Sequence, residues 1–172
     1  MFKKGQILAI PTDTSFGLAV RADDEETMDR MNTLKGRGSE KFFSLVVGNA
    51  EMLRKFAKLP DNFDAENWFF EKPRTAILEP TKLLPKSKFW PENKVAFRIS
   101  TIPDIADEIL KSGIPVTATS ANISGKPSLF NITDLQEVFG DNIRIYDKIP
   151  KLPFKEPSEI WDFTENPTKK IR

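Results

Sequence analysis

Short apolar segments alternate with segments of helical periodicity along the chain, and this alternation restricts the fold more than any other feature of the sequence. Residues 43–47 form a largely apolar run of the length typical of a buried strand. Met28 and Met31 recur at helical spacing behind Asp23 or Asp24, either of which can cap a helix. Such alternation predicts an α/β fold with a mixed sheet.

The individual elements follow from the positions of apolar runs and helix breakers. Pro103 suits the first turn of a helix that Gly113 would end, and Thr133 with Gln136 forms a capping-box pattern. We expect strands at 6–10, 43–47, 75–78, 95–99, 115–119, 143–146 and 160–163. We expect helices from 23 or 24 to about 36 and at 50–59, 62–71, 103–111 and 133–139, with a polar loop at 120–128.

The length of 172 residues fits one domain, which we expect to span 1–172. Hydrophobic residues make up 39% and charged residues 30%, fractions typical of a globular chain. No apolar run approaches the roughly 20 residues that a membrane-spanning helix needs. The N-terminal apolar stretch at 7–11 is too short for the core of a signal peptide, so we expect a cytoplasmic protein with no membrane partner.

The chain contains neither cysteine nor histidine. This excludes disulfides, thiolate nucleophiles, zinc sites built from Cys and His, and any Ser-His-Asp mechanism. Any catalysis must therefore use charge, hydrogen bonds and positioning. The net charge of +1 gives no strong overall field for nucleic acid, although a local basic face is compatible with it.

Three polar clusters lie next to expected strands. The first, residues 11–18, is a hydroxyl-rich turn in which Gly17 allows a close approach of the backbone, and its side chains would equally serve to stabilise that turn. The second is Lys35-Gly36-Arg37, followed by Lys41, at the end of a helix. Its cations either oppose the helix dipole or hold phosphate groups.

The third cluster, residues 119–128, combines small hydroxyl and amide side chains with Gly125 and Lys126 directly after a strand. Ligands of open α/β sheets bind beyond strand ends, and such a loop offers hydroxyl and backbone N–H donors to an anion. A binding loop explains this composition better than a simple solvated loop.

Taken together and in this order, the clusters resemble the YrdC-like family of threonylcarbamoyl-AMP synthases. The family pattern is P-T-D/E-T-x-Y-G-L, then K-x-R, then R-I-P, then S-A-N-x-S-G-x-P-S. The matching segments here are 11–18, 35–37, 98–100 and 120–128, so the resemblance covers essentially the whole chain. It implies an open twisted mixed sheet with flanking helices and a basic concave pocket.

The resemblance also implies residue roles, position by position. The implied catalytic residues are Lys35, Arg37, Ser120 and Asn122. The implied ATP-binding residues are Arg37, Lys41, Lys94, Ser120, Ser128 and Arg172. The implied threonine-binding residues are Thr14, Arg98 and Ser158, with Arg98 suited to the substrate carboxylate. No metal-binding residues are implied.

The activity implied by the resemblance is the synthesis of L-threonylcarbamoyl-AMP from L-threonine, bicarbonate or CO2, and ATP, with release of pyrophosphate, for tRNA modification. ATP would be a substrate and would carry Mg²⁺ with it. The implied partners are a downstream threonylcarbamoyl-transferase complex and tRNA or double-stranded RNA.

Two departures from the family pattern bear on the amino-acid pocket. Val46 stands where family members often have histidine, and Glu159 replaces the threonine of an S-T-V segment. They motivate an alternative, a YciO-like paralogue that binds nucleotide or RNA without threonine-dependent activity. The intact 120–122 segment argues against that alternative. A carbamoyl-transfer domain of a hydrogenase-maturation protein is a more distant third possibility.

Overall fold

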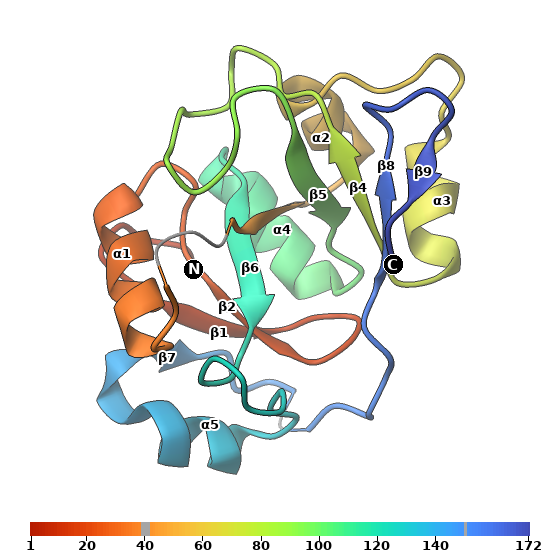
Figure 1. Cartoon of the computed structure of the whole chain (residues 1–172). Helices are drawn as coiled ribbons and strands as arrows, with labels where there is room; N and C mark the ends of the chain where they lie inside the picture. The colour runs from red at the N-terminus through yellow and green to blue at the C-terminus, as the bar shows by residue number, and fades with distance from the viewer. Residues whose placement is uncertain (39–41, 150) are drawn as a thin grey trace.

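The computed structural model describes residues 1–38, 42–149 and 151–172. These residues form a mixed sheet of nine strands in the order β7-β1-β2-β6-β3-β5-β4-β8-β9 (Figure 1). The strands are β1 (Leu8–Pro11), β2 (Phe16–Ala19), β3 (Ser44–Val47), β4 (Arg74–Leu78), β5 (Val95–Ile99), β6 (Val116–Ser120), β7 (Arg144–Ile145), β8 (Glu159–Asp162) and β9 (Lys169–Lys170). The helices are α1 (Glu25–Leu34), α2 (Ala50–Phe56), α3 (Ala65–Glu71), α4 (Pro103–Ser112) and α5 (Ile132–Phe139), followed by a short 3-10 turn, η1 (Gly140–Asn142). This confirms the expected α/β class.

Side chains on the two faces of the central strands have different surroundings: helices cover one face and leave the other uncovered. β3 pairs in parallel with β5, which places Leu45 beside Phe97 and Val46 beside Arg98. Leu45 and Phe97 are fully buried on the face that α2, α3 and α4 cover (Figure 1). Because successive strand residues point to opposite faces, Arg98 lies on the face that these helices leave uncovered.

Local signals explain where most helices begin and end. The side chain of Asp24 accepts a hydrogen bond from the Thr27 N–H (3.2 Å) and caps α1. Pro103 occupies the first turn of α4, and Gly113 ends that helix with a φ of 69°, a conformation that glycine adopts without strain. The capping box at Thr133 was wrong: Asn131 caps α5, because its side chain accepts from the Asp134 N–H (2.9 Å).

Other boundaries also differ from the expectation. β2 begins inside the cluster that we interpreted as a turn and ends one residue beyond it. The sequence did not predict this strand, because its four residues include Gly17 and are too few to show alternation. The two-residue β9 carries no apolar signal at all. The expected helix at 50–59 ends at Phe56, and the one at 62–71 begins at residue 65.

The segment between β4 and β5, residues 79–94, crosses from the sheet to α1. Ser87 Oγ donates to Glu25 (2.6 Å), and Lys88 pairs with Asp29 (2.8 Å). The segment brings Trp90 to the uncovered face of the sheet, where it is almost fully buried. Among the residues described, no helix is both long enough and apolar enough to cross a membrane.

Candidate active site

A cavity of about 880 Å³ occupies the uncovered face of the sheet. Alternate residues of the central strands line it, such as Ser44 of β3 and Arg98 of β5. Among the described residues that line it, five are cationic and none is acidic. The five are Arg37, Lys94, Arg98, Lys155 and Arg172. This charge suits an anionic ligand.

The cavity brings together most of the residues that the sequence singled out. Eight of them line it: Thr14, Arg37, Lys94, Arg98, Ser120, Ser128, Ser158 and Arg172. Lys35 and Asn122 do not line it but lie next to Ser120 beneath the loop that follows β6. Lys41 lies outside the described residues.

Lys35 is the residue that ties α1 to this loop. Its side chain is buried, with 2% of its surface exposed, and its ammonium donates to the main-chain oxygens of Ser120 and Asn122 and to Asn122 Oδ1. An ammonium group has three N–H donors, so all of them are satisfied by protein oxygens. Burial, with a contribution from the Arg37 charge, lowers the pKa of Lys35 to about 8. Lys35 therefore supports the loop and has no donor left for a ligand.

Asn122 completes the same support from within the loop. Its Oδ1 accepts from Ser120 Oγ (2.6 Å), and its Nδ2 donates to the Lys126 main-chain oxygen (2.5 Å). The Ser124 N–H donates back to the Lys35 main-chain oxygen (2.8 Å). These bonds fix the loop so that Ser120 and Ser128 line the cavity.

Arg37 lines the cavity with its guanidinium held by uncharged neighbours. It donates to Thr119 Oγ1 (3.1 Å) and to the Phe42 main-chain oxygen (3.2 Å), and it lies 5.1 Å above the centre of the Phe43 ring. Burial lowers the pKa of Arg37, but an arginine remains charged at neutral pH. Phe43 in turn contacts Phe89 of the 79–94 segment (5.1 Å between ring centres), so that segment supports Arg37 from below.

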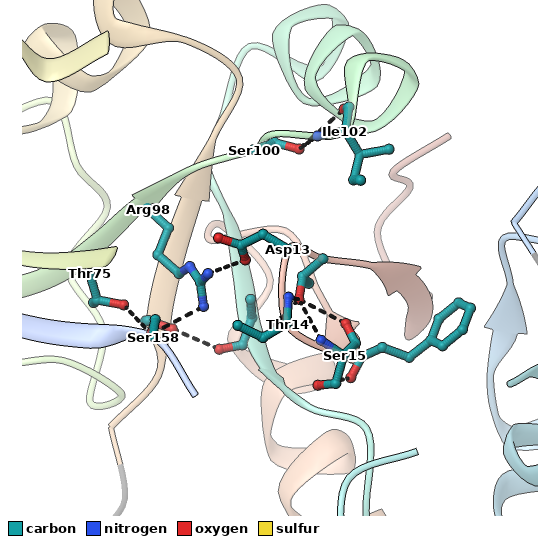
Figure 2. Close-up of polar contacts among 12 residues, drawn as sticks. Asp13, Thr14, Ser15, Thr75, Arg98, Ser100, Ile102 and Ser158 are labelled. Carbon is teal, nitrogen blue, oxygen red and sulfur yellow. Dashed lines mark hydrogen bonds and ion pairs between the residues drawn. The ribbon is translucent and has the colours of Figure 1, made fainter. Parts of the chain in front are cut away.

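Arg98 is held by two residues that come from different parts of the chain (Figure 2). One terminal nitrogen donates to Asp13 in the turn between β1 and β2, and the other donates to Ser158 Oγ (3.4 Å). Ser158 also shares a hydrogen bond with Thr75 Oγ1 of β4 (3.0 Å). The sequence interpretation missed Asp13, although it lies inside the first polar cluster and was the cluster's only ionisable residue.

Two further cations of the cavity, Lys94 and Arg172, contact residues in or next to β8. Lys94 lies 3.4 Å from the carboxylate of Asp162, which is buried. Burial alone would raise the pKa of Asp162, but hydrogen bonds from Thr164 and Lys94 lower it. Arg172 donates from Nε to the Ser158 main-chain oxygen (3.0 Å).

Glu159 does not face the cavity, so the expectation that it bears on the amino-acid pocket was wrong. Ser158 and Ile160 line the cavity, and the alternation of the strand turns Glu159 to the opposite face. There it accepts hydrogen bonds from Lys170 (2.8 Å), Lys72 (2.9 Å) and Trp161 (3.0 Å), which lower its pKa to about 2.

Val46 does lie beside Arg98 in the strand register. It lines a second cavity of about 20 Å³, large enough for one water molecule, together with Asp13 and Arg98. The position therefore borders the Arg98 site, as expected from the sequence.

The described residues contain no group of three or more carboxylates that could hold an ion, and the lining of the cavity is cationic. Such a lining fits a Mg²⁺ ion that arrives bound to the phosphate oxygens of a nucleotide, as part of the substrate.

Comparison with known proteins gives one family. The Sua5/YciO/YrdC family model, which is described as telomere recombination, matches residues 1–172. A threonylcarbamoyl-AMP synthase from Baumannia cicadellinicola is 32% identical over 166 residues, which cover 91% of this chain and 81% of that protein.

Solved structures agree with this assignment. The crystal structure of Pyrococcus abyssi Sua5 complexed with L-threonine aligns with a TM-score of 0.83 at 29% identity, over 98% of this chain and 50% of that one. This chain thus spans about half the length of the Pyrococcus protein. Escherichia coli YciO aligns with a TM-score of 0.79 at 20% identity over 98% of this chain and 82% of that one, which shows the shared fold. The family model matches the chain over its full length, and the fold that carries the cavity aligns with that of Pyrococcus Sua5. The chain therefore belongs to the Sua5/YciO/YrdC family.

Proposed function

We propose that this protein is an L-threonylcarbamoyladenylate synthase, which makes L-threonylcarbamoyl-AMP from L-threonine, bicarbonate or CO2, and ATP, and releases pyrophosphate. The observation that carries the proposal is that one cavity holds both the Arg98–Ser158 group and the Arg37–Ser120 group. The name of the Baumannia relative and the threonine complex of Pyrococcus Sua5 support it. The intact loop at Ser120 favours this function over a YciO-like paralogue without threonine-dependent activity.

The amino-acid half of the cavity would be the part around Arg98. A planar guanidinium pairs well with a carboxylate, and Ser158 and Thr14 add hydroxyl groups nearby. Threonine held in this way would present its amine for reaction with CO2 or bicarbonate. The product of that reaction is a carbamate, which carries the nucleophilic oxygen of the next step.

The nucleotide half would be the part around Arg37, with Ser120, Ser128, Lys94 and Arg172 as further contacts for ATP. The carbamate oxygen attacks the α-phosphorus of ATP, the bond from that phosphorus to the bridging oxygen breaks, and pyrophosphate leaves. Preorganised donors and cations stabilise the charge that develops on the phosphate, and holding the partners in line can contribute roughly 7–11 kcal/mol. Lys35 and Asn122 would serve this chemistry by positioning the loop that carries Ser120.

We also propose the setting of this activity. The product is an activated carbamoyl group, so a downstream threonylcarbamoyl-transferase must consume it and pass the group to tRNA. Because ATP and tRNA are both supplied there, we place the protein in the cytoplasm. Residues 1–172 would act as a single unit, since strands from both ends of the chain belong to one sheet.

The test is a reconstituted reaction with purified protein, L-threonine, bicarbonate and MgATP. Pyrophosphate release should require all three substrates, and mass spectrometry should detect threonylcarbamoyl-AMP. Release that does not depend on threonine, or no release at all, would refute the proposal. RNA binding that persists without ATP and weakens steeply with salt would instead support the YciO-like alternative.

A further inference from the structure

Asp13 lies behind Arg98 rather than in the wall of the large cavity. Its carboxylate accepts a hydrogen bond from Arg98, and both side chains are largely buried, at 14% and 15% exposed. Asp13 lines only the water-sized cavity beside Val46, whereas its neighbour Thr14 lines only the large one and Thr12 lines both. Asp13 therefore reaches a ligand only through Arg98 and through the electric field of its charge.

The Asp13 carboxylate is not what holds its own turn together. Thr12 Oγ1 donates to the Ser15 main-chain oxygen (2.7 Å) and accepts from the N–H groups of Thr14 and Ser15 (3.3 Å each). The turn is thus closed by Thr12, and the charge of Asp13 is directed at Arg98 (Figure 2).

The ion pair balances the charge of Arg98 but leaves some of its N–H donors able to bind a ligand. A guanidinium has five N–H donors, and the contacts to Asp13 and Ser158 use one on each terminal nitrogen. Three donors therefore remain for a ligand among the described contacts. The positive charge, however, is already balanced by the carboxylate at hydrogen-bonding distance.

This balance matters because the proposed reaction places two ligands of different net charge in one cationic cavity. The triphosphate of ATP carries several negative charges, and an amino acid is a zwitterion with no net charge. An unpaired guanidinium attracts a polyphosphate more strongly than a zwitterion, because Coulomb attraction grows with ligand charge. A guanidinium paired with a carboxylate loses most of that attraction, and its remaining N–H groups can still donate hydrogen bonds to a ligand.

We propose that Asp13 is a specificity-determining residue that reserves Arg98 for a zwitterionic amino acid and keeps polyphosphate out of that half of the cavity. The proposal rests on the proposed function, since it assumes that both ligands share the cavity. Asp13 acts here through Arg98, as a positioning residue, and has no role in the bond-making step.

The test measures the displacement of L-threonine by inorganic pyrophosphate. Isothermal titration calorimetry gives the Kd of threonine at increasing pyrophosphate for the wild-type protein and for Asp13→Asn, which keeps the size and removes the charge. We expect the wild-type Kd to change less than about threefold. In Asp13→Asn, pyrophosphate should become a competitor, and the preference for threonine over pyrophosphate should fall at least tenfold.

Three variants control the result. Asp13→Glu keeps the charge and should retain most of the preference. Asp29→Asn removes the same charge from the α1 surface, where Asp29 pairs with Lys88, and should behave like the wild type. In the double variant Asp13→Asn/Arg98→Gln, direct titration with pyrophosphate should no longer show the binding gained by Asp13→Asn, because the unbalanced positive charge is gone.

The outcomes separate this inference from the proposed function. A wild-type protein that binds threonine but releases no pyrophosphate refutes the function and leaves the calorimetric test valid. An unchanged preference in a folded Asp13→Asn protein overturns the inference, as does threonine binding that is absent or indifferent to Arg98→Gln. Should Asp13→Asn fail to fold, Asp13→Ser serves in its place, since its hydroxyl still accepts a hydrogen bond without a charge.

Discussion

The ammonium of Lys35 lies 2.8 Å from the main-chain oxygen of Asn122, although 87 residues separate the two along the chain. The contact joins the end of α1 to the loop after β6, and it is buried from solvent. A basic residue next to the proposed nucleotide site is thus committed to holding the backbone of that loop.

Replacing Lys35 with methionine should lower activity by orders of magnitude without removing a direct ligand contact. The substitution removes the Lys35 donor from the partly buried main-chain oxygens of Ser120 and Asn122, at about 1–3 kcal/mol for each group that stays unsatisfied, while Asn122 Oδ1 keeps its bond from Ser120 Oγ. Pyrophosphate release and hydrogen exchange of the loop amides measure the two effects. Low activity with unchanged loop protection would contradict the supporting role.

Activity should fall as pH rises above about 8, because burial lowers the pKa of Lys35 to about 8 and the neutral amine has only two N–H donors for three oxygens. Stability should respond in the opposite direction. Between pH 8 and the ordinary lysine value of 10.5, the unfolded chain binds more protons than the folded one, so Lys35 raises the free energy of unfolding as pH increases.

Two measurements check this opposition. A pH profile of kcat/KM should show the decline near 8, and urea titrations at several pH values give the free energy of unfolding. Lys35→Arg, whose charge persists at these pH values, should remove both the decline and the stability change whatever its absolute activity.

Arg37→Gln should raise the KM for ATP more than the KM for threonine. Arg37 lies in the same proposed half of the cavity as Ser120, where Thr119 and Phe42 hold it. Arg98 is held instead by Asp13 and Ser158. Losing a charge-assisted contact to phosphate costs about 1.5–3 kcal/mol, which corresponds to at least a tenfold loss in kcat/KM. Equal effects on both substrates would contradict the division of the cavity into two halves.

Glu159→Thr, which restores the residue of the family pattern, should leave the KM for threonine within about twofold. Glu159 points away from the cavity and pairs with Lys72 and Lys170. Steady-state kinetics with varied threonine test this, and thermal melting should detect only a small decrease, as expected for ion pairs at the surface. A large change in the KM for threonine would show that the carboxylate acts across the sheet.

Gly48→Ala should destabilise the fold while leaving the ligand affinities of the surviving protein unchanged. A Cβ at Gly48 would lie 2.5 Å from Leu110 Cγ and 2.7 Å from the Ala106 main-chain oxygen, so α4 would have to move. Overpacking of this kind costs about 1–3 kcal/mol. Urea titration measures the loss, and Gly38→Ala, whose Cβ meets no atom of the described residues within 4 Å, is the matched control.

The fold class and the assembly of the cavity could be predicted from the sequence, for different reasons. Apolar runs such as residues 43–47, which contain β3, can be recognised because burial demands them. The strands β2 and β9 could not be predicted, because their pairing depends on partners that are distant in sequence. The cap of α5 was misplaced by two residues because Asn131 and Thr133 are both good capping residues, and only the backbone conformation decides between them.

The candidate site shows the same division. The segments that carry Arg37, Arg98 and Ser120 were identified, since polar residues next to strand ends stand out in sequence. The contacts of each residue were not predicted, because they depend on the register of the strands. Lys35 looked like a phosphate ligand and proved to hold a loop, and Asp13 looked like a turn residue and proved to hold Arg98. Because side chains alternate along β8, Glu159 faces away from the cavity that its neighbours Ser158 and Ile160 line.

The two faces of the central strands have a practical consequence for changing this protein. Side chains such as Leu45 and Phe97 are buried on the face that α2, α3 and α4 cover, whereas Val46 and Arg98, one position away on the same strands, border the cavities. Alternate residues of the same short strands therefore contribute to core packing and to the proposed substrate site. An engineer could seek a higher melting temperature by repacking buried positions such as Leu45 and Phe97, which line neither cavity, while Val46 and Arg98 stay as they are.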